Sequence, residues 1–305
     1  MQSVSEPEAE QLPRHGMTRP EWIAHLSQVG AGHGFLERIG ARHLGLFVEE
    51  GDTLLISFDR AERVYADSAD GMPAGFEMVP RREWSFLSLM SIGRAGFRDA
   101  EIHAFFDRLV DEGVFDSFER VLFLGLGPAN GHAACAYSAA APGARVIASR
   151  PAARIGKAGA AAERYGNAPA LLSACEAAVL MHDPREPGGR ANAELFADAK
   201  VTQVSLPCTA PDLEATILDA ELLSPMFRAM ANLRLDAARL REILRPVLRA
   251  NGDYLMRLAT QARRSGHPRR AAAIARHGMT ATGEDRFAAL LSDLGVDDRP
   301  NAATG

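Results

Sequence analysis

The chain has 305 residues, of which 47% are hydrophobic and 24% are charged, with a formal net charge of -5. This composition is typical of a globular protein of one large or two smaller domains, and the negative charge argues against a general nucleic-acid partner. The three cysteines form no C-x-x-C pair, which argues against a disulfide framework and a zinc site. No apolar run approaches the roughly 20 residues of a membrane span, and the polar N-terminus is unlike a signal peptide. We therefore expect a cytoplasmic protein.

The N-terminal part of the chain is predicted to be disordered over residues 1–16 and then helical. Thr18 suits a helix cap and Pro20 a first turn, and Trp22 and Leu26 have helical spacing. The segments expected next are a short helix over 35–44, a hairpin of strands 45–50 and 53–58 joined by Glu50-Gly51-Asp52, and a loop over 59–78.

The middle of the chain alternates predicted strands and helices. An amphipathic helix over 99–112 carries Ile102, Phe105 and Leu109 on one face and ends before Gly113. Residues 84–92 are expected to form a short strand or a buried loop. The other predicted segments are strands over 121–124, 144–148, 177–181 and 201–206, and helices over 158–165, 168–174, 192–199 and 211–220. Such alternation is typical of an α/β fold with a mostly parallel sheet and helices on both faces.

A glycine-rich turn between a strand and a helix is the first candidate site. Gly125, Gly127 and Gly131 follow an apolar strand and precede an alanine-rich helix. Glycine lets the chain turn sharply or approach another group closely, and helix N-termini at the ends of central strands are common ligand sites. We therefore take Gly125, Gly127, Pro128, Asn130, Gly131 and His132 as candidate ligand-binding residues, with no metal or cofactor assigned.

Two known motifs, one for dinucleotide binding and one for serine hydrolysis, use such a turn, and this sequence matches neither completely. The dinucleotide fingerprint G-x-G-x-x-G fails because Asn130 stands at its third glycine, although a looser GxGxxxG fits. The serine elbow G-x-S-x-G fails because Gly127 or Pro128 occupies the position of the serine. In a dinucleotide site, Ser149 and Arg150 after the next strand would face a 2′-phosphate.

The C-terminal part changes to helices, expected over 235–249, 253–264, 269–277 and 284–294. The second and third of these have the form of one tetratricopeptide-like hairpin, with a helical lid or terminal cap as the alternative. A protein partner, if there is one, would bind these helices. The predicted divisions are a helical lead over 1–45, an α/β domain over 46–223 and a helical extension over 224–305.

Several stretches together resemble a group of α/β-hydrolase-like proteins of alphaproteobacteria. The matching segments are 54–59, 72–77, 105–113, 118–123, 132–138 and 141–148. Members of this group often carry the label phosphoadenosine phosphosulfate reductase. Neither the E-C-G-x-H segment nor the S-G-G-K-D-S loop of such a reductase occurs here, so we do not expect that activity.

The resemblance implies a Ser-His-Asp triad, of which this sequence keeps one member. Asp183, after a later strand, stands where the family has its acid. Gly127 replaces the nucleophile, and the run 207–212 after the last strand contains no histidine. Ser138, Cys208 and His182 are poor substitutes and are expected to be structural.

The function predicted from the sequence is a pseudo-hydrolase that acts in binding or protein interaction. The alternatives are an active hydrolase with a relocated nucleophile and an NAD(P)- or FAD-dependent oxidoreductase that uses the glycine turn.

Overall fold

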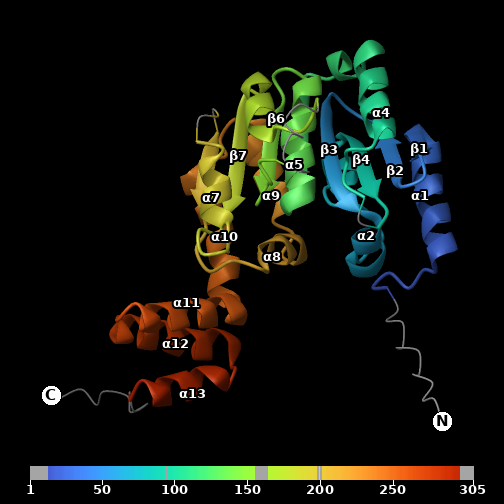
Figure 1. Cartoon of the computed structure of the whole chain (residues 1–305). Coiled ribbons are helices and arrows are strands. Elements are labelled where there is room, and N and C mark those ends of the chain that lie inside the picture. The colour runs from blue at the N-terminus through green and yellow to red at the C-terminus, as the bar shows by residue number, and fades with distance from the viewer. Residues whose placement is uncertain (1–12, 94, 155–163, 198, 200, 296–305) are drawn as a thin grey trace, which may run out of the picture. The chain divides into compact units, whose positions relative to one another are not determined.

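The computed structural model of the chain describes residues 13–93, 95–154, 164–197, 199 and 201–295 (Figure 1). These residues form two compact units, one of Met1–Leu180 with Leu195–Thr202 and the other of Met181–Glu194 with Gln203–Gly305, within those described ranges. The domain limits at 45 and 223 were drawn from the sequence pattern and not from contacts in the structure, so they stay a prediction. Within the described residues, no helix combines the length and apolarity needed to cross a membrane.

The strands form one eight-stranded sheet in the order β1-β2-β4-β3-β5-β6-β7-β8. Their bounds are β1 Gly34–Ile39, β2 His43–Val48, β3 Thr53–Arg60, β4 Ser85–Ser91, β5 Arg120–Leu126, β6 Arg145–Ser149, β7 Ala177–His182 and β8 Thr202–Ser205. Strands β4, β3, β5 and β6 run parallel, and β2 is antiparallel to both β1 and β4. The predicted α/β class, a mostly parallel sheet with helices and a C-terminal helical extension, is confirmed.

The helices of the first unit are α1 Arg19–His33, α2 Ala61–Asp67, α3 Met78–Arg82, α4 Ala100–Asp111, α5 Pro128–Tyr137 and α6 Ala168–Leu171. The predicted start of the first helix is confirmed, because Glu21 Oε2 accepts the backbone N–H of Thr18 at 2.7 Å. The predicted helix over 99–112 is confirmed as α4, whose buried face carries Ile102, Phe105, Phe106 and Leu109. Residues 1–12 and 155–163, predicted to be disordered and partly helical, lie outside the described residues.

Three predictions in the N-terminal part were wrong. Residues 34–39 form β1 rather than a helix, because their backbone pairs along its whole length with β2. The expected hairpin does not form, because β4 lies between β2 and β3. The expected loop over 59–78 contains α2, with Ala61 and Val64 buried.

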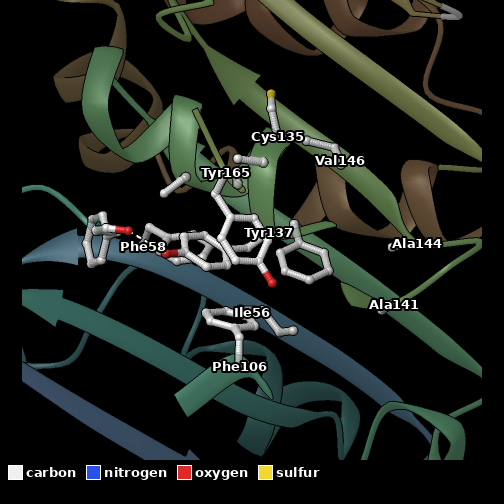
Figure 2. Close-up of a cluster of buried hydrophobic side chains, with 14 of the residues drawn as sticks. Ile56, Phe58, Phe106, Cys135, Tyr137, Ala141, Ala144, Val146 and Tyr165 are labelled. Atoms are coloured by element: carbon white, nitrogen blue, oxygen red, sulfur yellow. Dashed lines mark hydrogen bonds between the residues drawn. The ribbon is translucent and has the colours of Figure 1, made fainter. Parts of the chain in front are cut away.

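The central strands are buried on both faces, as parallel strands usually are. Every residue of β4 is buried, and so is every residue of β3 except Arg60. The core of this unit is an aromatic cluster around Tyr137, whose ring lies 4.2 Å from the ring centres of both Phe106 and Tyr165 (Figure 2). The Tyr137 hydroxyl donates to the carbonyl of Phe97 at 2.5 Å.

The helices of the second unit are α7 Gly189–Glu194, α8 Leu213–Asp219, α9 Leu223–Ala231, α10 Ala237–Ala250, α11 Gly252–Arg264, α12 Pro268–Thr282 and α13 Arg286–Asp293. The predicted helix over 192–199 ends at Glu194, and α9 was not predicted. Helices α11, α12 and α13 follow one another along the C-terminal part of the chain (Figure 1). They share a small core in which Leu255, Ala259 and Phe287 are buried. The tetratricopeptide-like assignment stays a prediction.

Candidate functional site

The glycine turn connects β5 to α5, as the sequence predicted. Gly127 has φ 90° and ψ 172°, a backbone conformation that only glycine adopts readily. Its N–H donates both to the Ser149 hydroxyl, at 2.9 Å, and to the Ser149 carbonyl, at 3.1 Å. A Cβ on Gly127 would have no heavy atom within 4 Å. The position that the family resemblance assigns to a nucleophile is therefore spatially open but carries no reactive atom.

The other two glycines of the turn are required by close backbone packing. A Cβ on Gly125 would overlap the backbone carbonyl of Asn130, and one on Gly131 would lie 2.9 Å from the Cα of Pro151. Pro128, in the first turn of α5, accepts the N–H of Ala152 at 3.0 Å. Packing of α5 against β5 and the chain after β6 thus explains the GxGxxxG spacing without a bound nucleotide.

His132 is held inside the first unit by two backbone carbonyls. Its Nδ1 lies 2.7 Å from the carbonyl oxygen of Ala152, and its Nε2 lies 2.9 Å from that of Tyr165. Burial lowers the pKa of His132, and the two carbonyls oppose this shift. The neutral imidazole has one N–H and donates it to one of the two carbonyls, so this histidine links α5 to the segment after β6 and presents neither nitrogen to the turn.

Asp183, in the second unit, follows β7 and is 2% exposed. Its Oδ1 accepts the N–H of Arg185 at 2.9 Å, and its Oδ2 accepts the N–H of Ala210 at 3.0 Å. The carboxylate therefore stabilises two loops. Among the described residues, no imidazole makes a hydrogen bond to it, which is the contact that the orienting acid of a triad makes.

The structure also shows a hydroxyl–imidazole pair that the sequence did not suggest. Ser205 Oγ lies 2.9 Å from His182 Nε2, on the neighbouring strands β8 and β7. Burial lowers the pKa of His182, and the charge of Asp183 partly opposes this. A neutral imidazole hydrogen-bonded to a serine is the contact by which a general base activates a nucleophile.

The other residues weighed from the sequence have structural roles. The Ser138 hydroxyl donates to the carbonyl of Cys135 at 2.8 Å and is fully buried. Cys208 is 6% exposed, and burial raises the pKa of its thiol, so it is a poor base. In the described part of the chain, no three His, Cys, Asp or Glu side chains gather as a metal site would require.

A pocket of about 580 Å³, which the sequence analysis did not predict, lies within the second unit. Its walls are the loops after β7 and β8 and one face of α11. The residues it brings together are Asp183, Arg185, Cys208, Arg257, Thr260 and Arg264. They come from three separate segments, so only the spacing of Arg257, Thr260 and Arg264 along one helix face was a readable signal.

Comparison with known proteins shows likeness of fold only. No family model and no curated protein matches the chain, so the alphaproteobacterial family remains a prediction. Similar solved structures include a capsule O-acetyltransferase of Neisseria meningitidis serogroup A, a mutant in complex with CoA, at 11% identity and TM-score 0.44, covering 66% of this chain and 98% of that one. A Pyrobaculum calidifontis esterase is 12% identical at TM-score 0.39, covering 70% of this chain and 92% of that one. A thermostable carboxylesterase from a metagenomic library is 12% identical at TM-score 0.38, covering 71% of this chain and 95% of that one. Such low scores carry no argument about activity.

Proposed function

We propose that this chain is a binding protein built on a hydrolase-like fold and that it does not hydrolyse esters by serine–histidine chemistry at its glycine turn. The observation that carries the proposal is Gly127, which stands at the nucleophile position with open space above it and no side chain. Glycine offers no oxygen or sulfur to attack a carbonyl carbon.

The polar side chains that the sequence offered for a catalytic site support the same proposal. Both ring nitrogens of His132 lie next to backbone carbonyls, and the Ser149 hydroxyl accepts the N–H of Gly127. Asp183 uses both carboxylate oxygens on backbone N–H groups. Each of these groups stabilises the fold, whereas a triad would need its histidine bonded to the nucleophile and its acid bonded to that histidine.

The second candidate function is a hydrolase with a relocated nucleophile, and the Ser205–His182 contact favours it. The pair has the hydrogen bond of a nucleophile and its base. Cross-strand side-chain contacts of this kind also stabilise sheets without any catalytic role. In the described residues, no third side chain bonds to the His182 ring, so the orienting acid is missing.

One experiment separates the two candidates. The purified full chain is treated with a fluorophosphonate probe and assayed with p-nitrophenyl acetate, alongside Ser205→Ala and Ser173→Ala. Ser173 is exposed on a helical turn and serves as the hydroxyl control. We expect no stoichiometric labelling and no burst in any of the three proteins. Labelling that Ser205→Ala abolishes and Ser173→Ala leaves intact would replace our proposal with the hydrolase.

A further inference from the structure

The geometry points to an anion-binding site in the second unit: the pocket between α11 and the loops after β7 and β8 takes a compact molecule that carries a phosphoryl or carboxylate group. This inference deepens the proposed binding function and rests on it. At about 580 Å³ the pocket has the size of a small-molecule site.

The position of the pocket follows from the sheet. Its loop walls begin directly after β7, which ends at His182, and soon after β8, which ends at Ser205. The region outside the carboxyl ends of the strands is where open α/β sheets bind ligands. The pocket lies entirely within the second unit and uses no residue of the glycine turn.

The charge of the pocket is positive at the groups left available to a ligand. Three arginines line it: Arg185 on the loop, and Arg257 and Arg264 on α11. Arg257 is fixed in place, since its Nε donates to the carbonyl of Cys208 at 2.9 Å and its guanidinium pairs with Asp212 at 2.6 Å. Within the described part of the chain, no carboxylate pairs with Arg185 or Arg264.

Two acidic residues, Asp183 and Glu186, also line the pocket, so its three arginines leave the lining with one net positive charge (three minus two). Asp183 is almost fully buried, and both of its oxygens accept backbone N–H groups. Arg185 and Arg264 therefore line the pocket as two guanidinium groups for which no carboxylate partner occurs among the described residues. Guanidinium groups bind carboxylate and phosphate in a bidentate manner, which sets the chemical class of the ligand.

The remaining lining gives the ligand a polar and an apolar contact. Thr260 and Gln261, one turn from Arg257 and Arg264 on the same helix face, add hydrogen-bonding groups. Met256 and Pro211 add apolar surface against which a short carbon skeleton packs. A bare inorganic ion would leave this surface unused, so we assign an organic oxyanion.

The test is calorimetric titration of the full chain with inorganic phosphate and, separately, with citrate. The variants are Arg185→Gln, Arg264→Gln and the double variant, with Arg276→Gln as the control, since Arg276 is exposed on α12 and does not line the pocket. A charge-assisted hydrogen bond contributes enough that each single variant should bind about tenfold more weakly and the control unchanged. Preference for phosphate assigns phosphoryl ligands, and preference for citrate assigns carboxylates.

Two results would overturn the inference: no heat with either anion, or binding that the double variant and the control weaken equally. Because the arginines are exposed, the variants should fold, and circular dichroism of each checks this. The outcome is separable from that of the proposed function. Anion binding together with serine labelling would support the anion site and contradict the non-catalytic role. No anion binding and no labelling would contradict the anion site and leave the non-catalytic role standing.

Discussion

Asp183 Oδ2 accepts the backbone N–H of Ala210 at 3.0 Å, so a carboxylate at the end of β7 holds the loop that follows β8. Its other oxygen closes the turn at Arg185. The family resemblance implies that Asp183 is a catalytic acid. In this structure its carboxylate instead hydrogen-bonds to both of the loops that line the pocket beside α11.

We predict that Asp183→Asn lowers the free energy of unfolding by about 1.5–3 kcal/mol, because the amide keeps one acceptor and turns its N–H₂ towards a backbone donor. Urea unfolding at pH 7 measures the change. Glu242→Gln is the matched control, since Glu242 is 68% exposed in an ion pair with Arg239 and should change stability by less than about 0.5 kcal/mol. Equal effects of the two variants would show that the two Asp183 contacts contribute little.

The glycines of the turn should differ in what they tolerate. Gly125→Ala is expected to displace α5, since its Cβ meets the backbone of Asn130, and to cost about 1–3 kcal/mol or more. Gly127→Ala meets no atom and costs only the backbone strain of its φ, about 1–3 kcal/mol. Hydrogen exchange of the α5 amides distinguishes them: we expect faster exchange in Gly125→Ala, and near-native protection in Gly127→Ala. Equal protection in both would contradict the packing role of Gly125.

Much of the sheet could be predicted from the sequence, because its central strands are apolar runs. The segments around Val121 and Val146 are buried on both faces and read directly as parallel strands. The error at residues 34–39 has a physical cause: β1 is an edge strand with mixed exposure, so its pattern resembles that of a helix start. The order β2-β4-β3 could not be read, since β4 inserts between chain neighbours.

The candidate sites differ in how far the sequence alone could predict them. The glycine turn was predictable because its signal is local, and the structure explains each glycine by packing or backbone angle. The contact of Ser205 with His182 was not, because it depends on which strands become neighbours. The arginine pocket joins Arg185 to Arg264 across 79 positions of sequence, and no spacing in the chain encodes that meeting.

His132 should make stability depend on pH in the mildly acidic range. Burial lowers its pKa in the folded chain below the ordinary 6.5, so the unfolded chain binds the proton more tightly. The contribution of neutral His132 to the free energy of unfolding is present above pH 6.5. It is lost as the pH falls from 6.5 to the pKa of His132 in the folded chain. The wild type should therefore lose more stability than His132→Gln between pH 7.5 and 5.5 in urea titrations. His182 has a pKa shifted the same way and needs its own His182→Gln variant. Parallel pH curves for wild type and His132→Gln would refute the assignment.

The three thiols should react slowly in the native protein. Cys135 is fully buried, and burial raises the pKa of all three, so little thiolate is present at pH 8. We expect Cys175, the most accessible, to react first with Ellman's reagent, and Cys135 to react only when the chain unfolds. Cys175→Ser should remove the first phase. A fast native phase that survives this substitution would show that another thiol is more accessible than the structure indicates.

Gly278→Ala should destabilise the C-terminal helices although alanine favours helix formation. A Cβ at this position of α12 would overlap the ring of Phe287, a fully buried residue of α13. Overpacking of about 1–3 kcal/mol then exceeds the gain of up to about 1 kcal/mol in helix propensity. Gly32→Ala in α1 is the matched control, because its Cβ meets no atom within 4 Å and only the propensity gain remains. Thermal unfolding of both variants is the measurement, and we expect shifts of opposite sign. A higher melting temperature for Gly278→Ala would mean that α13 repacks without cost around the added methyl group.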